Sequence, residues 1–215
     1  MKIGVIGSGT VGQTLASGFL KHGHEAMIGT REPSSDAMKK WTAANPGGQV
    51  GSFLEAAKFG EIVLVATAGK AATNAIELAG KENFAGKVLI DVNNPIDDAP
   101  PTDGVLPYFT GPNESLGEKI QALVPQARVV KAFNSVGAVK MIDPHYEQGM
   151  PTMFIAGNDA AAKATVADIL RQFGWESFDC GSIVAARAIE PLCMLWCIPG
   201  FRQNQWTHAF KLLMH

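Results

Sequence analysis

Cysteine is scarce in this chain, which has three in 215 residues: Cys180, Cys193 and Cys197. An odd number with none before position 180 argues against a disulfide framework and is typical of a reducing compartment, so we expect a cytoplasmic protein. Cys193 and Cys197 stand four residues apart and would share a helix face. We interpret them as small buried side chains, because a metal site would need further ligands and no histidine is close to them in the sequence.

A basic excess is also missing. Lysine and arginine total 18 against 20 aspartates and glutamates, for a net charge of -2, so we expect no nucleic-acid partner. No run of about 18 uncharged apolar residues is present, so we expect no membrane-spanning helix. The first residues, MKIGVIGSG, predict a strand and a turn rather than a signal peptide. Hydrophobic residues make up 47% of the chain, enough for a full core.

Short apolar segments alternate with amphipathic ones along most of the chain. The apolar segments 2–6, 25–29, 61–66, 87–92 and 128–132, with a short one near Val50, predict strands, and the segments 10–22, 34–44, 53–58, 71–79 and 114–123 predict helices. The alternation continues with strands at 152–156 and 175–180 around a helix at 159–173. This order is typical of an α/β protein of the Rossmann type, with a doubly wound, mainly parallel sheet.

The last part of the chain has a different pattern. Residues 183–197 are apolar nearly all round, which predicts a buried or interface helix interrupted at Pro191. We therefore divide the chain into a dinucleotide-binding domain, 1–181, and a short C-terminal helical segment, 182–215, that completes a cleft and a homodimer interface.

The six residues that directly follow the first strand form a glycine motif, Gly7-Ser8-Gly9-Thr10-Val11-Gly12. Between a strand and a helix, this spacing is typical of dinucleotide binding. Gly7 permits a tight turn, Gly9 leaves room for a pyrophosphate, and Gly12 lets the helix approach the sheet. The helix N-terminus then offers free N–H groups to the phosphates.

The second strand ends in Gly29-Thr30-Arg31. Proteins that bind NAD usually place a carboxylate at this position for the ribose hydroxyls. A hydroxyl with a guanidinium instead favours the 2′-phosphate of NADP(H). The alternative is that Arg31 is solvated and Glu32 binds the ribose.

Further candidates follow three later strands, whose carboxyl ends should meet at one edge of the sheet. We expect cofactor contacts from Ala66, Thr67, Ala68, Asn93, Asn94, Pro95, Phe133 and Asn134. Asn134 is the residue we expect closest to the nicotinamide, and Phe133 could pack below it. We interpret Lys131 as a structural or surface residue. His145 is a candidate acid without a partner in the sequence pattern.

The sequence shows no catalytic triad, no zinc-protease motif and no carboxylate pair. Hydride transfer between two stacked cofactors needs positioning rather than an acid or a base, so we assign no catalytic residue and no metal.

Several segments resemble the NADPH-dependent reductases of coenzyme F-420, a deazaflavin. They are MKIGVIGSGTVG, VLIDVNNP, ARVVKAFNSV, FIAGNDAAAKATVADILRQFGWESFDCG, AARAIEPLCMLW and HAFKLL. The chain is also similar to the reductase domain of STEAP metalloreductases, which use a flavin, and more distantly to pyrroline-5-carboxylate reductase. The resemblance implies a homodimer that transfers hydride between NADPH and a deazaflavin or flavin, with Thr30 and Arg31 at the 2′-phosphate.

Two other functions remain open. One is reduction of a small carbonyl or imine, although such enzymes normally add a large helical domain, and few residues remain here for one. The other is a non-enzymatic NADPH sensor.

Overall fold

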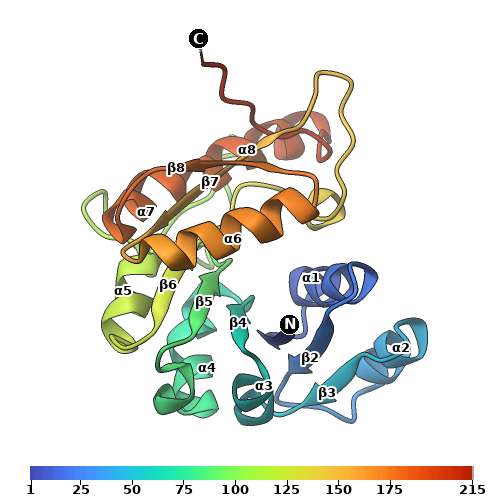
Figure 1. The fold of residues 1–215 in the computed structure, drawn as a ribbon. Helices are drawn as coiled ribbons and strands as arrows, with labels where there is room; N and C mark the ends of the chain where they lie inside the picture. The colour runs from blue at the N-terminus through green and yellow to red at the C-terminus, as the bar shows by residue number, and fades with distance from the viewer. Residues whose placement is uncertain (215) are drawn as a thin grey trace.

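Eight strands form one sheet in the computed structural model, which describes residues 1–214 (Figure 1). The strands are β1 (Lys2–Ile6), β2 (Glu25–Gly29), β3 (Gln49–Gly51), β4 (Ile62–Val65), β5 (Val88–Asp91), β6 (Arg128–Lys131), β7 (Thr152–Gly157) and β8 (Glu176–Asp179). The main helices are α1 (Thr10–Lys21), α2 (Asp36–Ala44), α3 (Phe53–Phe59), α4 (Ala72–Ala79), α5 (Leu116–Leu123) and α6 (Ala160–Gln172). The predicted segments are all present, with ends shifted by a few residues.

The strand order is β3-β2-β1-β4-β5-β6-β7-β8. All neighbouring pairs are parallel except β6 and β7, which are antiparallel. The chain winds outward in one direction from β1 to β3 and in the other from β4 to β6. This creates a topological switch point between β1 and β4, where open α/β sheets bind their ligands. The predicted doubly wound, mainly parallel fold is confirmed.

Helices cover both faces of the sheet, because its strands are apolar on both sides. One core joins the sheet to α1, α2 and α6 and contains Leu15, Phe19 and Trp41. The other joins it to α3, α4 and α5 and contains Ile76 and Ile120. Caps fix where two of these helices begin: Ser52 and Glu55 form a capping box on α3, and Asp159 accepts a bond from the N–H of Ala162 on α6.

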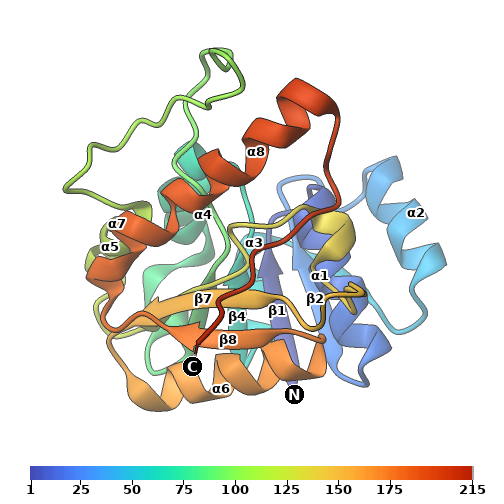
Figure 2. The same ribbon diagram turned by 90° about the horizontal axis from the view of Figure 1, so that it is seen from above.

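The C-terminal segment differs from the single helix predicted over 183–197. A short 3-10 turn, η4 (Ile183–Ala185), leads into α7 (Ala186–Ile189), and α8 runs over Pro191–Gln203. Pro191 begins α8, since the first turn of a helix tolerates a missing N–H. Figure 2 shows α8 beside the long loop that precedes α5, as the cluster of Leu106 with Trp196 also indicates.

The stretch Ile183–Gln203 is long and apolar enough to cross a membrane by length and composition alone, and 44% of its most apolar window is buried inside the structure. Burial of this kind is equally typical of a helix packed on a domain core. The absence of a membrane-spanning helix, expected from the sequence, therefore stays a prediction.

A buried ion network joins the sheet to the C-terminal helices. The Lys131 ammonium, fully buried at the end of β6, lies 2.7 Å from Asp91 Oδ2 on β5 and 2.8 Å from Glu190 Oε1. It also donates to the carbonyl of Asn93 at 2.7 Å. Burial disfavours the charge on Lys131, but the two carboxylates outweigh it, so the pKa of Lys131 is raised. Of the two sequence readings for Lys131, the surface position is wrong and the structural role is confirmed.

We expect Lys131→Met to lower the free energy of unfolding by about 3–5 kcal/mol, because it leaves two buried carboxylates without their cation. Urea unfolding followed by circular dichroism measures the change. Lys39→Met is the control, since Lys39 pairs with Asp36 on an exposed helix surface, where loss of an ion pair costs about 0.5 kcal/mol. Equal losses in the two variants would contradict a structural role for the buried network.

Candidate functional site

A cavity of about 650 Å³ opens at the carboxyl ends of β1, β2 and β4, at the switch point of the sheet. The glycine turn forms its base, and side chains from α2, α3 and α4 surround it. It is lined by Gly7, Ser8, Gly9, Thr10, Val11, Thr30, Arg31, Glu32, Ser35, Ala37, Phe53, Ala66, Thr67, Ala68, Ala71, Asn74 and Ala75. The predicted residues 7–11, Thr30, Arg31 and 66–68 thus line one cavity, whereas Gly12 lies outside its lining.

The three glycines of the motif have different surroundings. Gly7 has a φ of 127°, and a Cβ there would lie 2.3 Å from the carbonyl oxygen of Ala66. A Cβ on Gly12 would lie 2.1 Å from the carbonyl oxygen of Gly7. Gly9 has an ordinary φ of -72° and nothing within 4 Å of its Cβ position. The fold therefore requires glycine at positions 7 and 12, while at position 9 it leaves open space over the N-terminus of α1.

The end of β2 presents a polar surface to the cavity. The hydroxyl of Thr30 lies 3.0 Å from the Ser8 hydroxyl and accepts a bond from the N–H of Glu32. Thr30 is buried, whereas Arg31 and Glu32 are exposed and line the cavity with opposite charges. The guanidinium of Arg31 could bind a phosphate, and the carboxylate of Glu32 could bind ribose hydroxyls. The position of these side chains is therefore compatible with both hypotheses from the sequence.

The predicted residues after β5 and β6 lie outside this cavity, and their asparagines make hydrogen bonds within the protein. Asn93 donates to the carbonyl of Val65 and to Asp91. Asn94 donates to the backbone carbonyl of Asn134, and Asn134 donates back to the Asn94 side chain and to the carbonyl of Ile189. Pro95 is buried beside them. These contacts link the ends of two strands to the C-terminal helices.

Asn134 retains one free acceptor. Its Oδ1 is buried and has no hydrogen-bond partner among the described residues, while its Nδ2 has two. A buried acceptor without a partner costs free energy.

Phe133 does not lie where the sequence prediction put it. It is fully buried, with a φ of 62°, and its ring packs 6.2 Å from that of Phe173 in the core under α6. A ring with no exposed surface offers nothing to stack on, so the proposed packing below a nicotinamide is wrong for the structure as it stands. His145 lies exposed in the loop after β6, away from the cavity lining.

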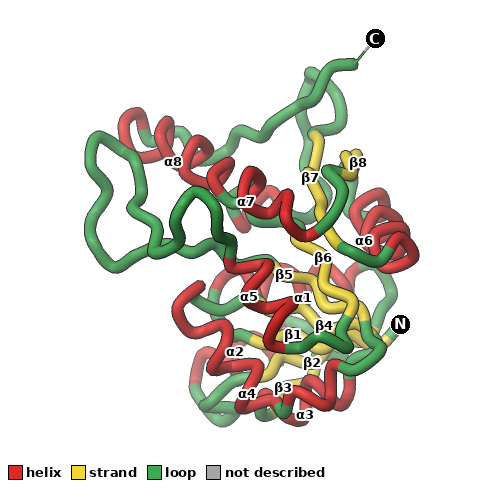
Figure 3. Tube along the Cα trace, turned by 90° about the vertical axis from the view of Figure 1, so that its left-hand side faces the viewer, coloured by secondary structure: helices red, strands yellow, loops and turns green. Residues whose placement is uncertain are grey.

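Sequence reasoning missed Asp91 and Glu190, the partners of Lys131. Glu190 is 1% exposed and accepts bonds from the N–H groups of Leu116 and Gly117 at the start of α5. The signal was present as an acid directly before Pro191 in an otherwise apolar segment, since a buried acid requires a partner. Figure 3 shows α7 and α8 following each other above α5.

The segment around Glu190 also contains a buried phenol and the two close cysteines. Tyr108 donates to the carbonyl of Glu190 at 2.8 Å, and burial raises its pKa, which keeps the hydroxyl a donor. Cys193 and Cys197 are buried on one face of α8 with their Sγ atoms 4.0 Å apart. The prediction that they are small buried side chains is confirmed.

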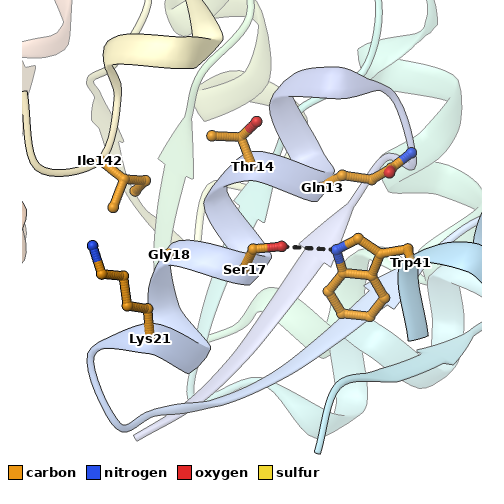
Figure 4. Close-up of a pocket in the computed structure, with 7 residues that line it drawn as sticks. All are labelled: Gln13, Thr14, Ser17, Gly18, Lys21, Trp41 and Ile142. Atoms are coloured by element: carbon orange, nitrogen blue, oxygen red, sulfur yellow. Dashed lines mark hydrogen bonds between the residues drawn. The ribbon is translucent and has the colours of Figure 1, made fainter. Parts of the chain in front are cut away.

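A second, shallower cavity of about 380 Å³ lies on the side of α1 (Figure 4). The Trp41 indole donates to Ser17 at 2.9 Å, and Gln13 donates to the carbonyl of Ser8. Lys21 pairs with Asp143. Because these polar groups are satisfied within the protein, the groove fastens α2 to α1 and offers no evident ligand contacts.

The fold and the first cavity define a dinucleotide-binding protein of the Rossmann type. A family model for NADP oxidoreductases, coenzyme F-420-dependent, matches residues 2–95. Over its whole length the chain is similar to a crystal structure from Arthrobacter sp. FB24 assigned as an F-420-dependent NADP reductase, with a TM-score of 0.93, 36% identity and 100% of both chains covered. The chain belongs to this family of oxidoreductases, which confirms the resemblance inferred from the sequence.

Two other groups of proteins share parts of this architecture. The metalloreductase STEAP3 of Rattus norvegicus is 30% identical over 202 residues, and the match covers 92% of this chain and 38% of STEAP3. The chain thus spans about two fifths of that longer protein. An imine reductase from Streptomyces aurantiacus matches with a TM-score of 0.67, 18% identity, 94% of this chain and 63% of its own, a likeness of fold alone.

We expect Gly9→Val to abolish binding of NADPH while leaving the free energy of unfolding within about 1 kcal/mol of the wild type, the usual range where no contact is broken. The added side chain would fill only the open space above α1. Gly12→Ala is the contrast, since its methyl group meets the Gly7 carbonyl and should destabilise the fold. Intrinsic fluorescence titration and urea unfolding measure the two effects, and a Gly9→Val protein that binds NADPH normally would refute the assigned cavity.

Proposed function

We propose that this protein transfers hydride between NADPH and a deazaflavin of the coenzyme F-420 type or a flavin. The observation that carries the proposal is the cavity itself: a glycine turn with open space over a helix N-terminus, beside a hydroxyl pair and an arginine at the end of β2. The full-length likeness to the protein assigned as an F-420-dependent NADP reductase supports the choice of acceptor.

In this proposal each part of the site has a separate task. The free N–H groups at the start of α1 bind the pyrophosphate, and Gly9 allows its approach. Thr30 and Arg31 bind the 2′-phosphate. The small residues Thr67 and Ala68 at the end of β4 let the nicotinamide half pass toward Asn94 and Asn134.

The orphaned Asn134 Oδ1 supports a place for Asn134 near the carboxamide of the nicotinamide, whose NH₂ group is a donor. The bound dinucleotide supplies a hydride, which is one proton with two electrons, and the acceptor ring takes it on carbon or nitrogen. The protein's part is to bring the rings together and exclude water. The homodimer and the cytoplasmic location belong to the same proposal and stay predictions.

Reduction of a small imine is the second candidate, supported by the fold alone. The fold matches that of imine reductases, but among residues 1–214 the lining of the cavity contains no histidine, lysine, tyrosine or aspartate, and its one carboxylate is Glu32. This cavity therefore adds no proton donor of these kinds to the likeness of fold.

We expect Arg31→Ala to weaken NADPH binding ten-fold or more and to leave NADH binding little changed. Loss of a charge-assisted bond to phosphate costs about 1.5–3 kcal/mol, and about 1.4 kcal/mol is ten-fold in affinity. Isothermal titration with both dinucleotides measures this. Glu32→Gln is the matched neighbour: if it weakens NADH and NADPH alike while Arg31→Ala does nothing, Glu32 binds the ribose and the assignment to NADPH is overturned.

With NADPH deuterated at nicotinamide carbon 4, we expect a primary isotope effect on the chemical step and stereospecific transfer of label to coenzyme F-420. The deazaflavin keeps the hydrogen on carbon, so mass spectrometry of the product detects it. We also expect no bell-shaped pH profile, since no acid or base is needed. A reduced deazaflavin without label would rule out direct hydride transfer, and oxidation of NADPH by neither coenzyme F-420, FMN nor FAD would rule out the proposed function.

A further inference from the structure

Glu190 occupies the joint between α7 and α8. Its Oε1 accepts bonds from Lys131 Nζ at 2.8 Å and from the N–H of Gly117 at 2.9 Å. Its Oε2 accepts a bond from the N–H of Leu116 at 3.0 Å. The three groups that reach this carboxylate are all donors, and they come from the end of β6 and the start of α5.

The backbone of the same joint is bound from two other directions. The carbonyl of Glu190 accepts from the Tyr108 hydroxyl, which lies in the long loop before α5. The carbonyl of the preceding residue, Ile189, accepts from Asn134 Nδ2 at 2.9 Å, and Asn134 in turn pairs with Asn94. Tyr108 and Asn134 thus hold the start of α8, and Asn134, with Asn94, connects it to the ends of β5 and β6.

We propose that Glu190 is a positioning residue for the hydride acceptor: it fixes α8 over the strand ends where the acceptor ring meets the nicotinamide. This inference rests on the proposed function and deepens it. Glu190 acts through Lys131 and the start of α5, and Asn134 holds the neighbouring carbonyl of Ile189. The cavity for the dinucleotide phosphates lies at β1, β2 and β4 and shares no lining residue with this joint.

The position demands a carboxylate of this length. Glutamine at 190 would turn an NH₂ group toward the N–H of Leu116 or toward Lys131 and Gly117, so one donor would face another. Aspartate is one methylene shorter and could not reach both Lys131 and the start of α5. The charge also balances Lys131, whose ammonium is 0% exposed.

The test compares Glu190→Gln with the wild type in three measurements. We expect the Kd for NADPH to stay within two-fold. We expect kcat/KM for coenzyme F-420 to fall ten-fold or more, with KM for the acceptor rising and the label transfer losing stereospecificity. We expect hydrogen exchange to speed up at α8 amides and to stay unchanged in β1 and α1. A general loss of stability would lower the active fraction without changing KM for the acceptor.

Two variants keep the test decisive. Tyr108→Phe removes only the bond to the Glu190 carbonyl and should give a milder change of the same kind, even if Glu190→Gln folds poorly. Glu118→Gln removes a carboxylate from α5 that pairs with Arg187 and does not touch Lys131, so its acceptor kinetics should match the wild type.

Unchanged acceptor kinetics and unchanged exchange in both Glu190→Gln and Tyr108→Phe would overturn the inference, as would equal losses in Glu118→Gln. If the wild type oxidises NADPH with none of the tested acceptors, the proposed function is wrong instead. In that case faster α8 exchange in Glu190→Gln supports only that Glu190 fixes α8, and unchanged exchange refutes that as well.

Discussion

The buried ammonium of Lys131 is the contact on which the second half of the molecule depends. An ion of this kind is costly to bury, and the cost is offset only where carboxylates and carbonyls surround it. Asp91 and the carbonyl of Asn93, both at the end of β5, do so together with Glu190 from the C-terminal segment. Charge compensation therefore forces β5, β6 and the joint before α8 into one arrangement, where apolar contacts alone would allow several.

The first half of the molecule is organised by the backbone instead. Gly7, Gly12 and the start of α1 form a turn whose shape follows from close approaches of main-chain atoms, at 2.3 Å and 2.1 Å from the missing Cβ positions. The contact at Gly12 is local, because the turn and the helix are consecutive in the sequence, whereas the contact at Gly7 is with the end of β4. The two halves of the site thus differ in what fixes them, main-chain packing in the first and charge compensation in the second.

This difference explains what could be predicted from the sequence. The strands, most helices, the glycine turn and the polar end of β2 follow from local patterns, and the structure has them where expected. Lys131 was ambiguous because its partners, Asp91 and Glu190, lie far away in the chain and only the folded sheet brings them together. The prediction for Phe133 was wrong for a related reason. The positive φ at that residue directs its side chain into the core, and no local sequence pattern indicates a positive φ there. The single helix predicted over 183–197 differs from the structure for the same reason: the acid Glu190 is visible in the sequence, but its partners on β6 and α5 are not.

The independence of the two halves has a consequence for how such a protein can diversify. Changes at β2 act on the adenosine end and leave Lys131 untouched. Changes in α8 or in the loop before α5 act through Glu190 and Tyr108 on the region beyond β5 and β6, and leave the glycine turn untouched. The C-terminal helices can then vary, provided that the carboxylate at their joint still compensates the lysine on β6.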